Sequence, residues 1–66
     1  MNVCKLECTF KFFSSTIIYV TSINCDDEVD KDLIMKRFIR DHKITTDKMK
    51  TNLKLIKCEK KNKIGL

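Results

Sequence analysis

The chain of 66 residues contains no proline and no tryptophan, and its single glycine is the next-to-last residue, Gly65. Its turns must therefore be built from serine, asparagine, aspartate and threonine, and a glycine-rich phosphate-binding loop is excluded. Long apolar runs are also missing. The longest, residues 17–20, is far shorter than the roughly 20 residues that span a bilayer. A chain of this length forms one domain at most, and we expect no membrane partner.

The N-terminus lacks the uninterrupted apolar segment of a secretory signal, because Lys5, Glu7 and Lys11 break it. We therefore expect a cytoplasmic protein whose cysteines are reduced thiols. The even number of cysteines leaves a disulfide framework open as the alternative interpretation. The four cysteines are Cys4, Cys8, Cys25 and Cys58.

These cysteines do not have the spacing of a zinc site. Cys4 and Cys8 are four residues apart on a predicted strand, which separates them by about 13 Å. Cys25 and the single histidine, His42, are expected at opposite ends of a helix, roughly 25 Å apart, which is too far for a cysteine–histidine nucleophile. We predict core packing for the other thiols, and we expect no catalytic residue, no metal and no cofactor.

Residues 3–13 alternate between apolar and polar side chains with period two. One face carries cysteine, leucine and phenylalanine, and the other carries lysine, glutamate and threonine. This pattern is typical of a strand in an antiparallel sheet that is covered on one side. Residues 13–16 indicate a turn, and the β-branched and aromatic residues 17–23 indicate a second strand.

The register of this hairpin stays open at the level of the sequence. A two-residue loop would set Phe12 opposite Ile17 and turn Tyr19 toward the buried face. A three-residue loop would instead bury Ile18 and Val20 and leave Tyr19 outside. Because a shift of one residue exchanges the two faces of a strand, the exposed sheet surface depends on this choice.

Residues 24–42 predict the one helix. Asn24 is a favourable N-cap, Asp27 resembles the acidic partner of a capping box, and further carboxylates crowd the first turns. Apolar residues cover well over half of the circumference at its centre, and Leu33 lies outside the arc that a sheet would bury. A lone helix cannot bury this whole surface, so we expect the surplus to bind a partner or a second copy of the chain as a homodimer. The alternative is that a tail or loop of the same chain covers Leu33.

Residues 45–51 form a polar connection with room for one helical turn, and residues 53–59 predict a third strand. A right-handed crossover through the helix brings this strand beside the first, which becomes the central one. The sequence therefore predicts an α+β fold with a three-stranded antiparallel or mixed sheet, in the order β-β-α-β, and one helix packed on one face. We assign residues 1–60 to a single domain and residues 61–66 to a basic C-terminal tail.

The net charge of +5 is distributed unevenly along the chain. Residues 1–32 include three basic and six acidic residues, whereas residues 33–66 include eleven basic and three acidic ones. A basic half of this size can contact DNA or RNA. The alternative is that its lysines only solvate the surface and protect an edge strand. The predicted nucleic-acid contacts are Lys54, Lys57, Lys60, Lys61 and Lys63.

The segments VCKLECTFKF, TIIYVTSIN, CDDEVDKDLIMKRFI and NLKLIKCEK together resemble the small strand-strand-helix-strand proteins of bacteriophages and mobile elements, a class that includes several anti-CRISPR proteins. The resemblance implies a non-catalytic inhibitor or modulator that binds a host protein or nucleoprotein, such as a CRISPR effector, inside the host cell. It carries over no functional residues. The helix surface itself predicts the partner-binding residues Leu33, Lys36, Arg37, Arg40 and Lys43, and the open face of the sheet is the alternative surface for the partner.

Overall fold

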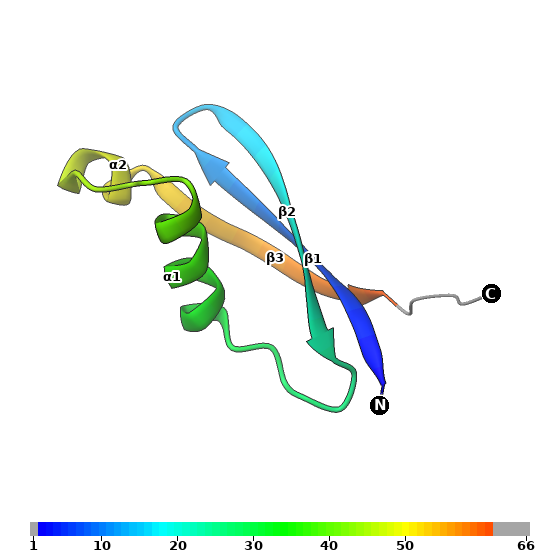
Figure 1. The fold of residues 1–66 in the computed structure, drawn as a ribbon. Coiled ribbons are helices and arrows are strands. Elements are labelled where there is room, and N and C mark those ends of the chain that lie inside the picture. Colours follow the sequence, from blue (N-terminus) through cyan, green and yellow to red (C-terminus); the bar gives the residue numbers. More distant parts are fainter. Residues whose placement is uncertain (1, 62–66) are drawn as a thin grey trace.

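The structure is a computed structural model that describes residues 2–61. The chain has a small α+β fold (Figure 1). Its elements are strand β1 (Val3–Phe12), strand β2 (Ser15–Asn24), helix α1 (Lys31–Asp41), helix α2 (Asp47–Thr51) and strand β3 (Leu53–Lys61). Strand β3 takes in Lys61, the first residue of the predicted tail, and the rest of that tail lies outside the described residues.

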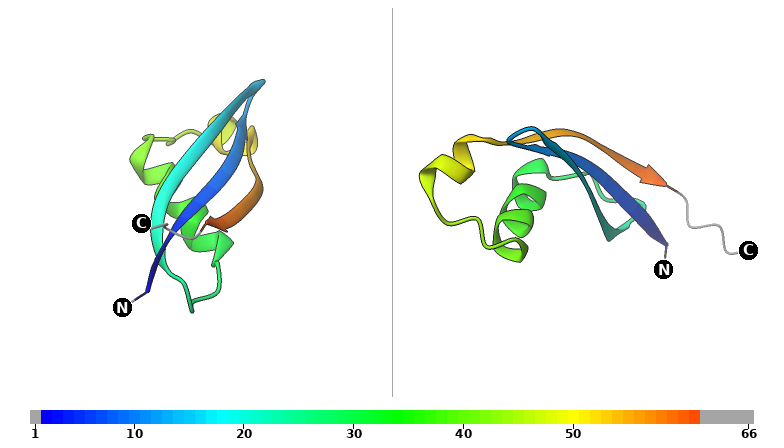
Figure 2. Two further views of the ribbon diagram at one scale, coloured as in Figure 1. Left: turned by 90° about the vertical axis from the view of Figure 1, so that its right-hand side faces the viewer. Right: turned by 90° about the horizontal axis from the view of Figure 1, so that it is seen from above.

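The three strands form one sheet in the order β2-β1-β3, and both pairings are antiparallel. The prediction that the N-terminal strand is central is confirmed, and of the two predicted sheet types the antiparallel one is found. Both helices lie on the same side of the sheet (Figure 2). No helix within residues 2–61 covers the opposite face, so that face is open to solvent or to a partner.

The hairpin between β1 and β2 turns on only two residues, because Phe12 pairs directly with Ser15. The predicted two-residue loop is therefore found, but the pairing expected for it was wrong, because Ile17 lies opposite Phe10 and not opposite Phe12. The buried face still matches the predicted two-residue loop, because Ile17 and Tyr19 pack against the core. The first turn residue, Phe13, has a φ of 56°, a left-handed conformation that costs a phenylalanine about 1 kcal/mol.

Helix α1 is shorter than predicted, because its N-cap is Asp30 and not Asn24. The Asp30 carboxylate accepts a hydrogen bond from the backbone N–H of Leu33, with an N···O distance of 3.2 Å. Asn24 is instead the last residue of β2, and the N–H of the next residue, Cys25, donates to the carbonyl of Asn2 at 3.0 Å. The side-chain oxygen of Asn24 accepts a hydrogen bond from the N–H of Asp26 and its carbonyl accepts one from the N–H of Asp27, both at 3.0 Å, so Asn24 opens a turn and not a helix. The first acidic residues therefore lie in a loop and not at the positive end of the helix dipole.

The core lies between α1 and the inner face of β1. The rings of Phe10 and Phe38 stack with their centroids 4.0 Å apart, and both side chains are fully buried together with Leu6. Burying a phenylalanine stabilises the fold by about 1.5–3 kcal/mol. The predicted apolar face of α1 is confirmed by the burial of Ile34 and Phe38, whereas Leu33 stays 46% exposed.

A second short helix, α2, occupies the connection that the sequence allowed to hold a helical turn. The hydroxyl of Thr46 caps it by accepting a hydrogen bond from the N–H of Met49 at 3.2 Å. The chain leaves α1 through Lys43, whose φ of 52° is left-handed, and this bend lets Ile44 turn into the core. Helix α2 therefore leads the chain back to the sheet at the start of β3 (Figure 1).

Two disulfides join the four cysteines. Cys4 is bonded to Cys25 and Cys8 to Cys58, with Cα atoms 5.1 and 4.0 Å apart. The expectations of reduced thiols and of a helix-terminal thiol at Cys25 were therefore wrong, and the disulfide alternative is the one observed. The predicted core packing holds for Cys4 and Cys8, which are buried. Sequence spacing concealed both bonds, because each joins β1 to a residue that only sheet pairing brings beside it. Cys8 and Cys58, for example, are direct register partners.

Candidate interaction surfaces

The strands and the ends of the chain carry the whole net charge of the protein. Residues 25–52, which include both helices and their loops, contain seven basic and seven acidic residues. This helical layer is therefore neutral, and the excess of +5 belongs to the rest of the chain. The acidic half of the sequence, residues 1–32, and the basic half, residues 33–66, do not correspond to these two layers. Each half contributes residues to the sheet and to the helical layer, which lies on one side of the sheet.

Five lysines project from the sheet face that no described helix covers, and we call this surface the lysine face. Alternation along β1 turns Lys5 and Lys11 away from the core. The β3 register sets Lys61 beside the first and Lys54 beside the second, and Lys57 lies between these two on β3. Cross-strand neighbours on one face are about 5 Å apart, so the lysines lie in two adjacent rows, in which Lys5 and Lys11 are six residues or about 20 Å apart along β1.

Two glutamates, Glu7 and Glu59, face each other within these rows. The ammonium nitrogen of Lys61 is 3.3 Å from a carboxylate oxygen of Glu7, and that of Lys57 is 4.0 Å from Glu59. Exposed ion pairs of this kind contribute little to stability. They also leave the lysine face with five positive and two negative side chains, which is a clear positive excess.

The predicted nucleic-acid residues do not all reach this surface. Lys60 points to the other side of the sheet, where its ammonium group donates to the carbonyl oxygens of Cys25, at 3.0 Å, and Asp27. Lys63 lies outside the described residues. Three of the predicted lysines lie on the lysine face: Lys54, Lys57 and Lys61.

The remaining two lysines of the lysine face were not predicted as contacts. Lys5 and Lys11 belong to the half of the chain with more acidic than basic residues. The charge balance of that half therefore excluded them from the predicted nucleic-acid contacts. The signal that could have found them is the period-two alternation of β1, which assigns both side chains to the wet face. Their neighbours on β3 could not be identified without the register.

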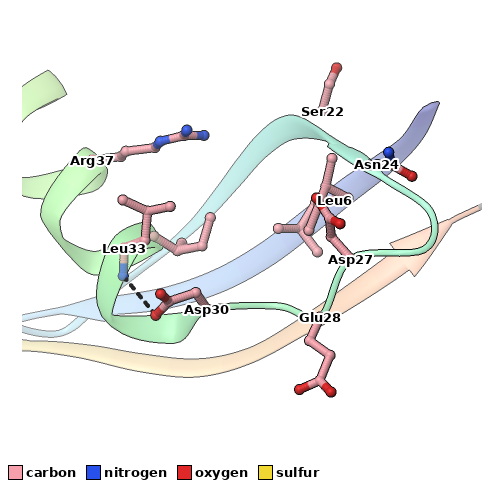
Figure 3. Close-up of a pocket in the computed structure, with 10 residues that line it drawn as sticks. Leu6, Ser22, Asn24, Asp27, Glu28, Asp30, Leu33 and Arg37 are labelled. Carbon is pink, nitrogen blue, oxygen red and sulfur yellow. Dashed lines mark hydrogen bonds between the residues drawn. The ribbon is translucent and has the colours of Figure 1, made fainter. Parts of the chain in front are cut away.

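A second candidate surface lies where α1 runs beside the end of β2. A pocket of about 260 Å³ opens there, which we call the α1–β2 pocket (Figure 3). Its apolar wall includes Leu6 and Leu33, and Arg37 lies above it from the helix. Carboxylates of the loop before α1 line the other side, namely Asp27, Glu28 and Asp30.

The predicted partner-binding residues fall into two groups. At 100° per residue, Leu33, Lys36, Arg37 and Arg40 share an arc of about 100° on α1, away from the buried side chains. Leu33 and Arg37 line the α1–β2 pocket. Lys43 follows the end of the helix and does not belong to this stripe. The structure therefore brings four of the five residues to one side of α1.

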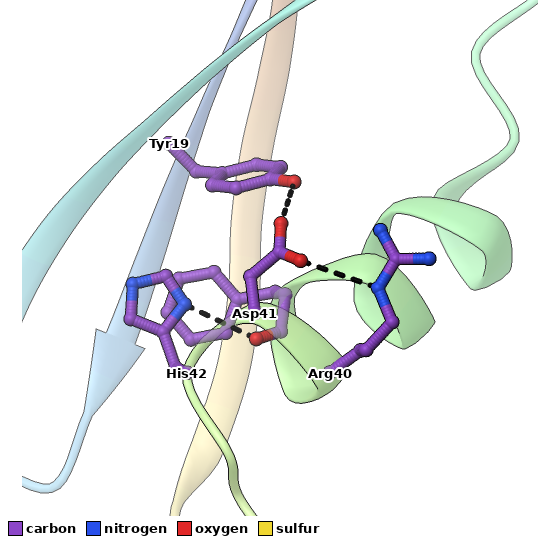
Figure 4. Close-up of polar contacts among 5 residues, drawn as sticks. Tyr19, Arg40, Asp41 and His42 are labelled. Atoms are coloured by element: carbon purple, nitrogen blue, oxygen red, sulfur yellow. Dashed lines mark hydrogen bonds and ion pairs between the residues drawn. The ribbon is translucent and has the colours of Figure 1, made fainter.

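Tyr19 connects β2 to the end of α1 (Figure 4). Its hydroxyl donates to the carboxylate of Asp41 at 2.8 Å, and the Nε of Arg40 donates to the other carboxylate oxygen at 3.2 Å. Burial raises the pKa of Tyr19, and the hydrogen bond to Asp41 adds to this effect. The same hydrogen bond lowers the pKa of Asp41. His42 stacks on Phe38 with ring centroids 4.0 Å apart, so it serves as packing at the end of the helix.

Residues 2–61 contain no group of three or more histidine, cysteine, aspartate or glutamate side chains that could hold a metal ion. Within the same range, no helix has the length and apolar character needed to cross a membrane. No protein-family model matches the chain, and no curated protein or solved structure is significantly similar to it. The function must therefore be inferred from the two surfaces themselves.

Proposed function

We propose that the protein is a small non-catalytic interaction protein that binds nucleic acid, alone or as part of a nucleoprotein, through the lysine face. The observation that carries this proposal is the separation of charge in three dimensions. An uncovered sheet face has five lysines against two glutamates, while the helical layer on the other side is neutral. A flat basic surface of this kind attracts a polyanion and steers its approach.

The chemistry of the lysine face favours contact with the phosphate backbone. Lysine acts as a point charge on phosphates, and the counterions released on binding make the affinity salt-dependent. Reading of bases would need aromatic or bidentate side chains. The strand positions of this face provide lysine, glutamate, threonine, serine and aliphatic residues, and also Asn24, whose side-chain oxygen already accepts a hydrogen bond from the N–H of Asp26. We therefore expect binding with little sequence preference.

The test is a fluorescence-anisotropy titration with labelled single- and double-stranded DNA and RNA at two salt concentrations. The test variant replaces Lys11, Lys54 and Lys57 by glutamine. The matched control replaces three lysines of the helical layer by glutamine, namely Lys31, Lys36 and Lys48. Both variants lose three positive charges, so they differ only in the surface that is changed.

We expect the lysine-face variant to bind at least tenfold more weakly and to lose about two to three units of the slope of log K against log salt, at 0.7–0.9 per phosphate contact. The control variant should retain most of the affinity. Equal losses in the two variants would contradict a defined surface and indicate attraction by net charge alone. No binding at low salt would refute the proposal.

A second candidate function is the binding of a host protein at the α1–β2 pocket. The observation that favours it is the exposed Leu33 beside Arg37, because apolar anchors next to arginine are common in the centres of protein interfaces. In this form the protein would act as a phage or mobile-element inhibitor of the anti-CRISPR type. A CRISPR effector is then the first host complex to test.

The test of this second function is the variant Arg37→Glu, with Lys48→Glu as a control that makes the same charge reversal on α2. A partner that docks on the pocket should lose at least tenfold in affinity with Arg37→Glu and little with the control. Unchanged binding of Arg37→Glu to a captured effector would exclude this surface.

The disulfides bear on the predicted cytoplasmic location. A reducing cytoplasm holds cysteines as thiols, whereas disulfides persist in oxidising compartments. The oxidised form observed here therefore favours an oxidising environment, and action inside a host cell requires that the reduced chain also folds. Repeating the binding titration with and without a reductant distinguishes the two cases, since a cytoplasmic protein must bind in both.

A further inference from the structure

Strand β2 is an unprotected edge strand. It lies at the end of the sheet order, so one of its sides faces no other strand of residues 2–61. Its ten residues, STIIYVTSIN, include no charged residue and no proline. Natural proteins usually protect a long edge with lysine, proline or a bulge. The opposite edge, β3, has that protection, since its nine residues LKLIKCEKK include four lysines and its pairing with β1 contains a bulge.

The backbone groups on the free side of β2 can be identified from the ladder. Cys8 and Cys58 have Cα atoms only 4.0 Å apart, which is the close spacing of a non-hydrogen-bonded pair. The N–H and C=O of Cys8 therefore point the other way, toward its β2 partner Tyr19. Because this direction alternates along a strand, Ile18 and Val20 direct their N–H and C=O groups to the free edge.

We propose that a second copy of the chain pairs with β2 in antiparallel orientation, which makes a six-stranded sheet across a two-fold axis at Tyr19. In this register Ile18 lies opposite Val20 of the partner subunit, and the reverse pair forms by symmetry. Both side chains are on the outer face, where they are 53% and 49% exposed in the single chain. The dimer covers this apolar surface and satisfies the free backbone groups in the same step.

A second copy fits this edge better than a charged partner does, because β2 offers no side chain that would recognise charge. The net charge of +5 opposes association most strongly at the surfaces that carry the lysines, whereas β2 itself carries no charge. In the dimer, the nearest lysine-bearing strands are the two copies of β1, three strand spacings or about 14 Å apart. This distance exceeds the Debye length of about 8 Å at physiological salt, so their repulsion is largely screened.

The dimer also has a consequence for the outer surface. The two lysine faces lie on the same side of the six-stranded sheet, with the uncharged β2 strands between them.

Pairing of two ten-residue strands makes a small interface, so we expect a dissociation constant of about 1 μM to 100 μM, in the range of weak interfaces. The dimer forms without nucleic acid, and its test does not depend on the proposed function.

Sedimentation equilibrium from about 10 μM to about 1 mM measures the association directly. The test variant is Val20→Lys, which puts a charge beside the axis, and the matched control is Ile56→Lys on β3, where the isoleucine is 54% exposed on the opposite edge. We expect the wild-type chain and the control to dimerise alike, and Val20→Lys to weaken the dimer at least tenfold. Circular dichroism of each variant first establishes that it is folded.

Amide hydrogen exchange of the wild-type chain gives a second readout that needs no variant. The amides of Ile18 and Val20 should be protected at high concentration and exchange quickly at low concentration. The amide of Tyr19, which points to β1, should be protected at both. A chain that remains monomeric at about 1 mM overturns the proposal. So does a dimer that Val20→Lys leaves intact, because it would have to form through another surface such as Leu33 on α1.

Discussion

The two edge strands of the sheet are nearly equal in length and opposite in chemistry. Strand β2 has no charged residue among ten, whereas β3 has five among nine, four of them lysines. Both pair with the same central strand, and within the described part of the chain no further strand pairs with the outer side of either. Pairing with the central strand therefore depends on the backbone, whereas the side chains of an edge strand determine whether a further strand can pair with its free edge.

The two edges also differ in how they are attached to the rest of the molecule. Strand β3 is bonded covalently to β1 within its length, through Cys58. Strand β2 is held by the turn at Phe13, by the disulfide of Cys25 just beyond its end, and by the hydrogen bond of Tyr19 to Asp41. Each of these attachments can be removed separately.

Among the predicted changes, removal of the disulfide that joins β3 to β1 should lower the free energy of unfolding the most. The double variant Cys8→Ala, Cys58→Ala opens a crosslink between residues 50 apart in sequence, which is worth about 4 kcal/mol of unfolding free energy. The corresponding variant of Cys4 and Cys25, whose separation is 21 residues, should lose about 3 kcal/mol. Urea denaturation of oxidised samples measures both losses. Equal stability of wild type and variants would show that the disulfides contribute nothing.

Exchange of the edge chemistry should have the next largest effect. The variant Lys54→Thr, Lys57→Ile gives β3 a composition close to that of β2, and we expect its self-association to tighten by roughly tenfold. Sedimentation equilibrium gives the measurement. The control Lys36→Ile adds the same side chain on α1 and should leave association unchanged. If both variants associate equally, general hydrophobicity and not the edge is responsible.

Two variants of Phe13 test how the hairpin turn holds β2 to β1, and they are expected to differ less in stability than the variants above. Phe13→Gly and Phe13→Ala both remove the ring, which is 44% exposed, so they differ only in backbone preference. Because φ at this position is 56°, the glycine variant should be more stable than the alanine variant by about 1 kcal/mol. Thermal denaturation of the two variants measures the difference. Identical stability would indicate that the turn relaxes out of the left-handed region.

The smallest effect is expected from Tyr19→Phe, which removes the hydrogen bond to Asp41 and should lower the stability at neutral pH only slightly, because the pair is exposed. The lowered pKa of Asp41 means that its stabilisation is present above about pH 4 and is lost as the pH falls through the folded-state value. The raised pKa of Tyr19 means that its stabilisation is lost as the pH rises above about 10. Urea denaturation at several pH values should show the two proteins converging at both extremes.

The sequence predicted the features that depend on neighbouring residues. Alternation in residues 3–13 identified the central strand and its wet face, and helical periodicity left Leu33 unburied, as observed. The N-cap was missed for a reason that lies outside its own neighbourhood. Asn24 has the right side chain for a cap, but it ends β2 and bonds the N–H groups of Asp26 and Asp27 in a turn, and Asp30 caps the helix instead.

The sequence alone predicted the three strands, the faces of the central strand and the apolar side of α1, because each follows from periodicity within one segment. It also predicted the central place of β1, from the right-handed crossover. The register, and with it the partners across the sheet, came only from the tertiary structure, which pairs Cys8 with Cys58 and Lys11 with Lys54. These partners are far apart in the chain, and their contact depends on a register that a two-residue turn and a bulge set. The lysine face and the unprotected edge are both products of that register, so the surfaces available for function appear only when the chain is folded.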